Sequence, residues 1–454
     1  MPERLVVIRG GTVVDPRGVR RADVVVSGRT VRAVGEDLEV PASATVLDAG
    51  GCFVTPGLVD LHAHLRQPGY EEAETIETGT RAAALGGFTA VVAMPNTEPP
   101  VDNAGTAREV LALGRDAVAE VAVAGAITVG RAGDRLAPLA ELAALGVRLF
   151  TDDGAGVQDA GLMRRALEYA RGLGVVLAQH CEDEALAAGG AMNEGAWSSR
   201  LGIPGVPSAA EEVMVGRDLA LVRLTGARLH FLHLSTAGSV ELVRRAKAEG
   251  LPVTAEAAPH HFSLTDACVA GYDPVFKVSP PLRSPADVAA VASGLGEGVL
   301  DAIATDHAPH PPEAKDLPFE QAPPGMLGLE TALAVSFSEL AAGPAEGVSG
   351  VVPPRRRLGP QEIFALLSWH PAAIAGLGAG NARPAGRGAH GGPLQRGAAA
   401  NVCVFDPRAV WTVDPARLAS RSRNTPYAGR RLVGRVRHTL LYGEPVVVDA
   451  VAQR

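Results

Sequence analysis

The sequence predicts an α/β fold, a (β/α)8 TIM barrel with a small β-sandwich domain built from both chain ends. Through the middle of the chain, eight short apolar segments alternate with helical stretches. Both ends instead contain Val- and Ile-rich strands separated by Gly and Asp turns. A doubly wound sheet also alternates strands and helices, but no G-x-G-x-x-G or G-x-x-x-x-G-K phosphate loop follows the first strand.

The barrel is predicted to occupy residues 56–395. Its expected strands are 58–62, 89–94, 121–127, 147–150, 175–179, 228–233, 252–257 and 300–305. Its expected helices are 73–85, 104–115, 135–145, 161–172, 209–225, 236–249 and 285–296. Because a barrel carries its active site at the carboxyl ends of the strands, we look for chemistry in the residues that follow each strand.

The two chain ends, 1–55 and 396–454, are predicted to share one sheet domain, because each alone offers few strands for an independent core. The Gly-rich segment 376–396 is expected to be a linker into the second half of that domain. Segments 310–327 and 342–360 are rich in Pro and Gly. The first follows the eighth strand, so it is either a lid over the active site or a plain connector.

Composition excludes several classes of protein. The 454 residues include 47% apolar and 20% charged side chains, which is typical of a globular protein. The net charge of −8 argues against general binding of nucleic acid or anionic membranes. No apolar run approaches the roughly 20 residues of a membrane span, and no signal peptide is apparent. Four isolated cysteines without a C-x-x-C pair favour a reducing cytoplasm.

Histidines at the ends of the predicted strands indicate a metal site. His62 and His64 are two residues apart, so in a strand both imidazoles point to the same face and can bind one ion. His180 and His233 each close an apolar strand and are candidates for a second ion. Asp306 follows the eighth strand, where it can touch the first metal and handle a proton. Zinc suits ligands of this kind.

Two metal ions need a bridging group. A carbamylated lysine after the fourth strand is one solution, but no lysine occurs before Lys247. Asp152 and Asp153 offer carboxylates at that place, and their spacing alone does not decide between them.

The remaining histidines give weaker signals. His230 lies three residues before His233, so it is expected to face the helices. His260 and His261 are candidates for an outer layer that supports the metal ligands. No metal-ligand pattern is found for His307, His370, His390 and His438.

Nine strings, in order along nearly the whole chain, carry a resemblance to a known family. They are PGLVDLHAHLRQPG (56–69), ETIETGTRAAALGGFTAVVAMPNTEPPVD (74–102), FTDDGAGVQD (150–159), QHCED (179–183), TAEAAPHH (254–261), SPPLR (279–283), ATDHAPH (304–310), PGMLGLETAL (324–333) and SRNTPY (422–427). Together they resemble the dihydroorotases of the amidohydrolase superfamily, specifically the bacterial type whose metal bridge is an aspartate.

The resemblance implies a site of two zinc ions. His62, His64 and Asp306 are implied to hold the first zinc, His180 and His233 the second, and Asp153 rather than Asp152 to bridge them. The implied substrate-binding residues are His64, Arg66, Asn96, Ser279, His310, Pro324 and Gly325. Ser279 departs from the family, which usually has Asn there. A serine still donates and accepts, and a water can fill the gap, so affinity is affected more than the reaction.

By resemblance, the expected reaction is reversible hydrolysis of (S)-dihydroorotate to N-carbamoyl-L-aspartate in pyrimidine biosynthesis, with Asp306 as the catalytic proton carrier. A homodimer and association with aspartate carbamoyltransferase are implied as partners. One alternative is another cyclic-amide hydrolase, such as an allantoinase or hydantoinase. Ser279 supports it, but such relatives usually carry the bridging lysine. The other alternative, a non-catalytic scaffold for the transferase, is opposed by the complete set of six metal ligands.

Overall fold

A computed structural model describes residues 5–39, 41–341, 356–381 and 387–454. Most of the Pro- and Gly-rich segment 342–360, and residues 382–386 of the predicted linker, lie outside the described residues. None of the helices in the described part of the chain combines the length and apolar character needed to cross a membrane.

Eight parallel strands run through the centre of the chain, and each coincides with a predicted strand. They are β8 (Leu58–Ala63), β9 (Phe88–Ala93), β10 (Glu120–Val123), β11 (Leu149–Phe150), β12 (Val176–Gln179), β15 (Leu229–Phe231), β16 (Val253–Ala257) and β17 (Ala302–Ile303). They form the sheets β10-β9-β8 and β11-β12-β15-β16-β17. Isolated parallel bridges join Gly125 to Phe150 and Ala63 to His307 at the edges of these sheets.

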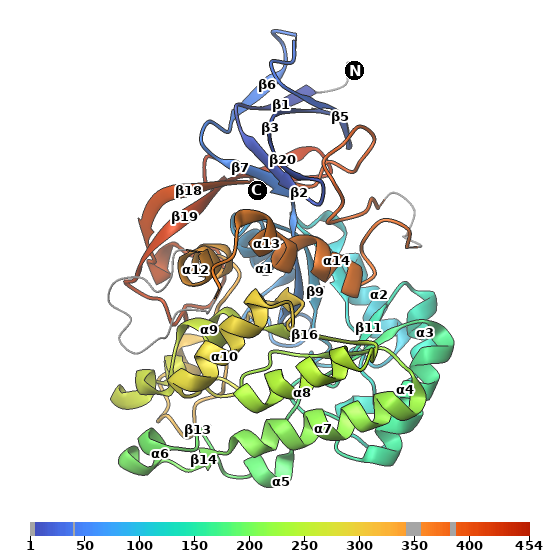
Figure 1. The fold of residues 1–454 in the computed structure, drawn as a ribbon, viewed down its shortest axis with the longest axis vertical. Helices are drawn as coiled ribbons and strands as arrows, with labels where there is room; N and C mark the ends of the chain where they lie inside the picture. The colour runs from blue at the N-terminus through green and yellow to red at the C-terminus, as the bar shows by residue number, and fades with distance from the viewer. Residues whose placement is uncertain (1–4, 40, 342–355, 382–386) are drawn as a thin grey trace.

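Helices separate successive strands, as the sequence predicted. The longer ones are α1 (Ile76–Leu85), α2 (Ala104–Leu113), α3 (Leu139–Ala144), α4 (Ala160–Leu173), α7 (Ser208–Thr225), α8 (Ala237–Ala248) and α10 (Pro285–Gly296). Shorter ones are α5 (Glu184–Ala187), α6 (Ala196–Leu201), α9 (Pro259–Ser263), α11 (Pro312–Lys315), α12 (Ala332–Ser336), α13 (Pro360–Phe364) and α14 (His370–Ile374). The mixed α/β class is therefore confirmed, and Figure 1 shows α4, α7 and α8 packed side by side on the outside.

Helix α4 shows how local sequence defines these elements. Asp159 caps its amino end by accepting a hydrogen bond from the Leu162 amide at 2.5 Å, and Gly174 ends it in a left-handed conformation. Leu162, Ala166 and Ala170 recur every four residues and are buried. This apolar stripe packs in the same core cluster as Leu177 and Leu229 from neighbouring strands.

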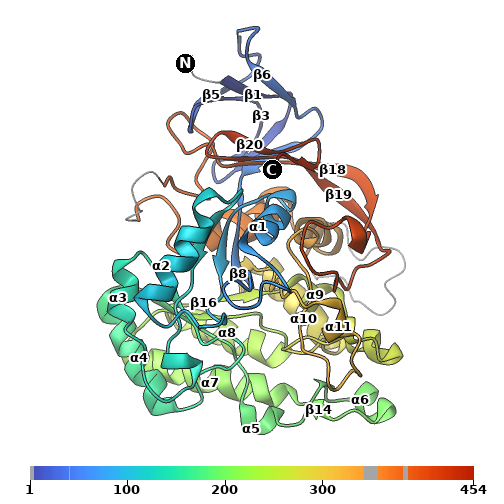
Figure 2. The same ribbon diagram turned by 180° about the vertical axis from the view of Figure 1, so that it is seen from behind.

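The two chain ends pair with each other in one sheet. Its order is β21-β20-β19-β18-β7-β2-β3, and β7 (Phe53–Pro56) pairs antiparallel with β18 (Val402–Thr412). The other strands of this sheet are β2 (Thr12–Asp15), β3 (Gly18–Arg21), β19 (Arg431–Leu441), β20 (Glu444–Val448) and β21 (Val451–Ala452). Both ends lie together in the upper part of Figure 1 and Figure 2, in line with the strand pairing between them.

A second sheet, β5-β4-β1-β6, comes from the amino-terminal end alone. Its strands are β1 (Leu5–Arg9), β4 (Asp23–Ser27), β5 (Thr30–Gly35) and β6 (Thr45–Asp48). One apolar cluster joins the two sheets, because it contains Ile8 and Val24 from the second sheet together with Val54, Val404 and Leu440 from the first.

Candidate active site

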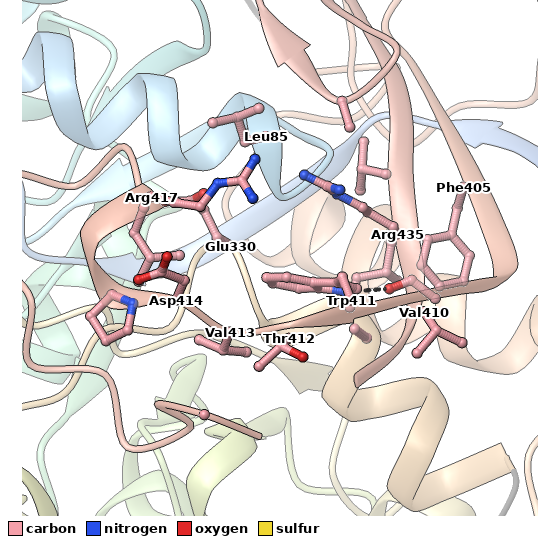
Figure 3. A pocket seen from close by; sticks show the side chains of 18 residues that line it. Leu85, Glu330, Phe405, Val410, Trp411, Thr412, Val413, Asp414, Arg417 and Arg435 are labelled. Atoms are coloured by element: carbon pink, nitrogen blue, oxygen red, sulfur yellow. Dashed lines mark hydrogen bonds between the residues drawn. The ribbon is translucent and has the colours of Figure 1, made fainter. Parts of the chain in front are cut away.

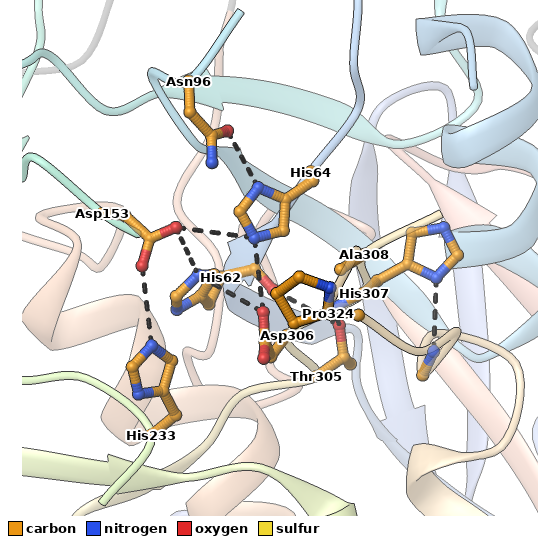
Figure 4. Close-up of polar contacts among 12 residues, drawn as sticks. His62, His64, Asn96, Asp153, His233, Thr305, Asp306, His307, Ala308 and Pro324 are labelled. Atoms are coloured by element: carbon orange, nitrogen blue, oxygen red, sulfur yellow. Dashed lines mark hydrogen bonds and ion pairs between the residues drawn. The ribbon is translucent and has the colours of Figure 1, made fainter. Parts of the chain in front are cut away.

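Strand ends bring the six predicted metal ligands into one buried cluster. His62 lies in β8 and His64 directly after it, while the other four follow β11, β12, β15 and β17. The cluster consists of His62, His64, Asp153, His180, His233 and Asp306, and every member is at most 6% exposed. Figure 4 shows five of these side chains converging from different strands.

The first group is built on the pair predicted from their spacing. The Nδ1 atom of His62 lies 3.2 Å from Glu256 Oε1, and that of His64 lies 2.9 Å from Asn96 Oδ1. Since both partners are oxygen acceptors, each Nδ1 carries a proton, and each Nε2 is the nitrogen left to face a metal. The Nε2 atom of His62 is buried and has no hydrogen-bond partner among the residues that the structure describes. An orphaned basic nitrogen of this kind fits a metal ligand.

The second group, Asp153, His180 and His233, also brings imidazole nitrogens and a carboxylate together. His180 Nδ1 lies 3.1 Å from His233 Nε2, and both atoms face Asp153 Oδ1, at 3.6 and 3.5 Å. The ligand atoms of Asp153, His180 and His233 all lie within 4.8 Å of one another, as do those of His62, His64 and Asp153. Two imidazole nitrogens turned toward one point and one carboxylate are a fitting donor set for a cation.

Asp153 and Asp152, which the spacing left unresolved, differ clearly in their surroundings. Asp153 Oδ2 lies 3.3 Å from His62 Nε2 while its Oδ1 faces the other histidine pair, so one oxygen points into each group. Asp152 is engaged by main-chain donors, since its Oδ1 accepts from the amides of Ile127 and Thr128 at 2.8 and 3.0 Å. Asp153 therefore has the position of a bridge, and Asp152 holds the preceding loop in place.

Asp306 faces the first group from the end of β17. Its Oδ1 lies 3.3 Å from His64 Nε2 and 3.6 Å from His62 Nε2, and its backbone is in the left-handed region at φ 45°. The preceding residue is anchored, because the Thr305 amide and hydroxyl both donate to Asp60, at 2.9 and 2.6 Å. Asp60 thus ties the ends of β8 and β17 together.

Charge in the cluster favours a cation. Burial raises the pKa of Asp153 and of Asp306, but the surrounding imidazoles outweigh it and bring both pKa values well below the usual range. Burial also opposes ionisation of Glu256, yet hydrogen bonds from His230 and His62 lower its pKa to about 2. Burial opposes a charge on His62 as well, but Asp153, Glu256 and Asp306 raise its pKa well above the ordinary value. Buried carboxylates thus require positive charge beside them, which either protonated imidazoles or a bound cation can supply.

The residues expected to bind a substrate carboxylate lie beside this cluster. Within the described part of the chain, no ion pair holds the Arg66 guanidinium, whose Nε donates to Pro309 O at 3.2 Å. Its Nη2 lies 3.5 Å from His310 Nε2. Burial and the neighbouring arginine lower the pKa of His310 to about 3, so its imidazole is neutral at pH 7. Asn96 uses its oxygen on His64, which leaves its amide nitrogen to donate to a ligand.

The other expected substrate contacts are held by main-chain and carboxylate partners. His310 Nε2 donates to Pro324 O at 2.8 Å, and the next residue, Gly325, has φ 144°. A side chain on Gly325 would place its Cβ 2.7 Å from His310 Nε2, so this close approach requires glycine. The Ser279 hydroxyl donates to Glu182 Oε2 at 3.3 Å, two residues beyond His180.

The structure adds residues that the sequence did not reveal. Glu256 orients His62 and also receives His230, whose Nε2 lies 3.0 Å from Glu256 Oε2. His230 therefore lies in the same interior network as the predicted ligand His62, and the expectation that it faces the helices was wrong. Asn424 accepts from the His310 amide at 3.2 Å and donates to Gly325 O at 3.1 Å. No signal beyond the string SRNTPY marked Asn424.

Two neighbouring histidines form part of the surroundings. His260 Nε2 is buried, has no hydrogen-bond partner within the described residues and lies 4.0 Å from Asp306 Oδ2. His307, next to the predicted ligand Asp306, points elsewhere, with its Nε2 at 3.3 Å from Glu74 Oε2. Figure 4 shows the His307 ring turned away from the cluster, as expected for a histidine without a ligand pattern.

Cavity size does not identify this site. A cavity of about 810 Å³ lies against the β18–β19 hairpin and is lined by Glu330, Trp411, Asp414, Arg417 and Arg435 among others (Figure 3). None of the predicted site residues lines it.

Comparisons with known proteins agree with this geometry. A dihydro-orotase-like family model matches residues 51–239. A dihydroorotase of Anaeromyxobacter dehalogenans (strain 2CP-C) is 49% identical over 98% of this chain and 99% of the relative. Dihydroorotases of Pelotomaculum thermopropionicum, at 48%, and Streptomyces coelicolor, at 46%, cover 98% and 97% of this chain and 99% and 98% of their own length.

Solved structures of related hydrolases share the fold. An L-hydantoinase (dihydropyrimidinase) from Arthrobacter aurescens superposes with a TM-score of 0.82 at 25% identity, covering 99% of this chain and 97% of that one. A dihydropyrimidinase from Brevibacillus agri gives a TM-score of 0.81 at 24% identity, covering 99% and 96%. With the near full-length relatives and the clustered histidines and aspartates, these findings imply a divalent metal and show that the chain belongs to the dihydroorotase family of cyclic amidohydrolases.

Proposed function

We propose that the protein is a dihydroorotase with two zinc ions, which reversibly converts (S)-dihydroorotate and water to N-carbamoyl-L-aspartate in pyrimidine biosynthesis. The observation that carries this proposal is a pair of buried ligand groups sharing Asp153, next to Arg66, which forms no ion pair with any described residue. The ligands suit hydrolysis of an amide, and the arginine suits a ring that bears a carboxylate.

We also infer the domain organisation. The eight central strands form a closed (β/α)8 barrel in residues 56–395, and the parallel bridges at the sheet edges support this closure. Residues 1–55 and 396–454 form a β-sandwich, supported by the apolar cluster that both of their sheets share.

In the proposed site, His62, His64 and Asp306 would hold one zinc ion, His180 and His233 would hold the other, and Asp153 would be shared by both. Bound zinc supplies Lewis-acid chemistry, which lowers the pKa of water and polarises the amide carbonyl. Glu256 and Asn96 engage Nδ1 of the first two imidazoles and leave Nε2 to face a metal, so the ligand geometry exists before the metal binds.

Asp306 moves the proton. Its carboxylate accepts a proton from the attacking water and delivers it to the ring nitrogen as the C–N bond breaks. Arg66 holds the substrate carboxylate through its guanidinium, which presents two parallel N–H donors to a carboxylate. The amide nitrogen of Asn96 and the main chain at Pro324 and Gly325 complete the orientation of the ring.

Turnover on three ring substrates tests the proposed function. Zinc-loaded protein is assayed on dihydroorotate, allantoin and dihydrouracil under the same conditions. Preference for dihydroorotate supports the proposal. Preference for a ring without a carboxylate would replace it with another cyclic-amide hydrolase, and two bound zinc ions without any turnover would contradict it.

Arg66→Met is expected to raise KM for dihydroorotate by about 100-fold, since a charge-assisted pair to a carboxylate contributes about 1.5–3 kcal/mol. The methionine side chain retains the apolar contacts made by the aliphatic part of Arg66. Steady-state kinetics on dihydroorotate measures the effect, with Arg66→Lys as the control that retains charge but loses the planar fork. An unchanged KM in Arg66→Met would remove this residue from the carboxylate site.

Ser279→Asn is expected to leave the enzyme active and to lower KM by a few fold, because the longer amide replaces an indirect contact with a direct one. Among the described residues the Ser279 hydroxyl has one hydrogen-bond partner, Glu182 at 3.3 Å, so the change disrupts little. Titration with dihydroorotate measures the change. A folded but inactive variant would mean that this pocket is built differently from that of the family.

The partners expected from the sequence remain proposals. We propose a cytoplasmic homodimer that associates with aspartate carbamoyltransferase. Sedimentation of the chain alone, and of its mixture with the purified transferase, tests both associations. A monomer in each experiment would contradict them.

A further inference from the structure

The main chain of Pro323–Gly325 is fixed on several sides. Beyond the bond from His310 to Pro324 O, the Gly325 amide donates to Lys277 O at 2.9 Å. Asn424 donates to Gly325 O at 3.1 Å. The proposed function places this peptide against the substrate ring, so whatever holds it also sets the width of the binding site.

Lys315 is the charged group in this arrangement. It is the last residue of α11, the short helix between β17 and the peptide (Figure 2). Its Nζ donates to Pro323 O at 2.7 Å, to Pro274 O at 3.1 Å and to Lys277 O at 3.4 Å. The oxygen of Lys277 thus receives both the Gly325 amide and the Lys315 ammonium. One side chain connects the peptide to the segment opposite.

An ammonium suits this position in a way that a guanidinium does not. Lys315 is half-buried, and its ammonium has three N–H groups, one for each of the three carbonyl oxygens around its Nζ atom. A guanidinium is planar and cannot donate in this tripod. The chain contains 39 arginines and only three lysines, Lys247, Lys277 and Lys315. Lys315, one of these three lysines, occupies a position that suits the compact ammonium group.

Three carbonyl dipoles face the Lys315 amino group. Within the described residues no carboxylate forms an ion pair with it. Burial and the nearby Lys277 lower the pKa of Lys315 to about 7, whereas Asp273 favours its charge from a greater distance. We propose that Lys315 is a positioning residue, which fixes the peptide Pro323–Gly325 at the edge of the active site and so sets substrate affinity. Its effect on affinity rests on the proposed function, whereas its effect on the peptide does not. On this basis the segment 310–327 forms one side of the active site and is held in place by Lys315.

Lys315→Met tests the proposal, because methionine keeps much of the apolar stem and removes all three donors. We expect KM for dihydroorotate to rise about tenfold while kcat stays within about threefold, since the loss concerns binding and not the chemical step. We also expect the Gly325 amide to exchange its hydrogen at least about tenfold faster in the substrate-free protein. Mass spectrometry of peptides covering 319–327 measures this exchange.

Lys247→Met is the matched control. Lys247 pairs with Asp301 at 2.6 Å, at the amino end of β17 and so at the end opposite Asp306. Its loss is expected to leave both KM and the Gly325 exchange rate unchanged. Lys315→Gln, which retains two donors without charge, is expected to give intermediate values and replaces the methionine variant if that one does not fold.

The outcomes are distinct. Unchanged exchange at Gly325 in a folded Lys315 variant would overturn the proposal, and so would a loss of kcat at constant KM. If the wild-type protein does not hydrolyse dihydroorotate, the proposed function fails, but the exchange rates still decide the role of Lys315.

Discussion

Replacing Asp306 with alanine is expected to lower kcat on dihydroorotate by about 10²–10⁴-fold, the contribution of a well-placed general acid–base group. The side chain is the only one of the six clustered residues that we place in both metal binding and proton transfer. Four histidines and Asp153 remain in the variant, so much of the metal is expected to stay bound. Metal analysis of the purified variant, together with steady-state kinetics, separates the two roles.

Asp306→Asn is the matched control for that experiment. Asparagine keeps the shape of the side chain and one ligand oxygen but cannot accept the proton. It is expected to retain more metal than alanine and to lose as much of kcat. Near-normal turnover in either variant would exclude Asp306 as the proton carrier, whereas loss of metal in both would make the kinetic result a matter of binding.

Much of the metal site could be predicted because its residues follow strands. The strands themselves are continuous apolar runs, such as TAVVAM and VVLAQ, which sequence patterns reveal well. A parallel arrangement then brings the residues after each strand to one rim. Spacing of two within a strand placed His62 and His64 together, and the structure has both Nε2 atoms facing Asp153.

The direction of His230 was predicted wrongly because the alternation of side chains along a strand does not continue into irregular backbone. The rule that residues three apart face opposite sides holds only within a regular strand. Strand β15 ends at Phe231, and His233 lies beyond it with φ 29°. His230 and His233 are therefore on different kinds of backbone, and both end in the interior. No pattern in the sequence records this change of direction.

Residues that act through tertiary contact were also missed. Glu256 lies in β16, 194 positions from the His62 it orients, and nothing local distinguishes it from a buried structural carboxylate. Strand β3 does not fit the Val- and Ile-rich pattern expected of the chain ends. Its sequence GVRR is polar, and it pairs with β2 at the edge of its sheet, where one flank needs no apolar cover.

Alanine substitutions of the adjacent residues Asp152 and Asp153 are expected to have large but different effects. One should lower the stability of the protein and the other its affinity for metal. Asp153→Ala removes the only oxygen donors shared by the two ligand groups and leaves four imidazoles without a carboxylate between them. We expect the affinity for metal to fall at least about 100-fold, beyond what the loss of a supporting partner costs. Metal content after dialysis, and turnover in the presence of added zinc, measure this.

Asp152→Ala is expected to keep its metal and to lose stability. It frees the buried amides of Ile127 and Thr128, and an unsatisfied buried donor costs about 1–3 kcal/mol. A lower melting temperature with two ions bound, set against a metal-depleted Asp153→Ala, would support Asp153 as the bridge. The reverse pattern would give that role to Asp152, because the residue whose loss empties both sites must be the one that they share.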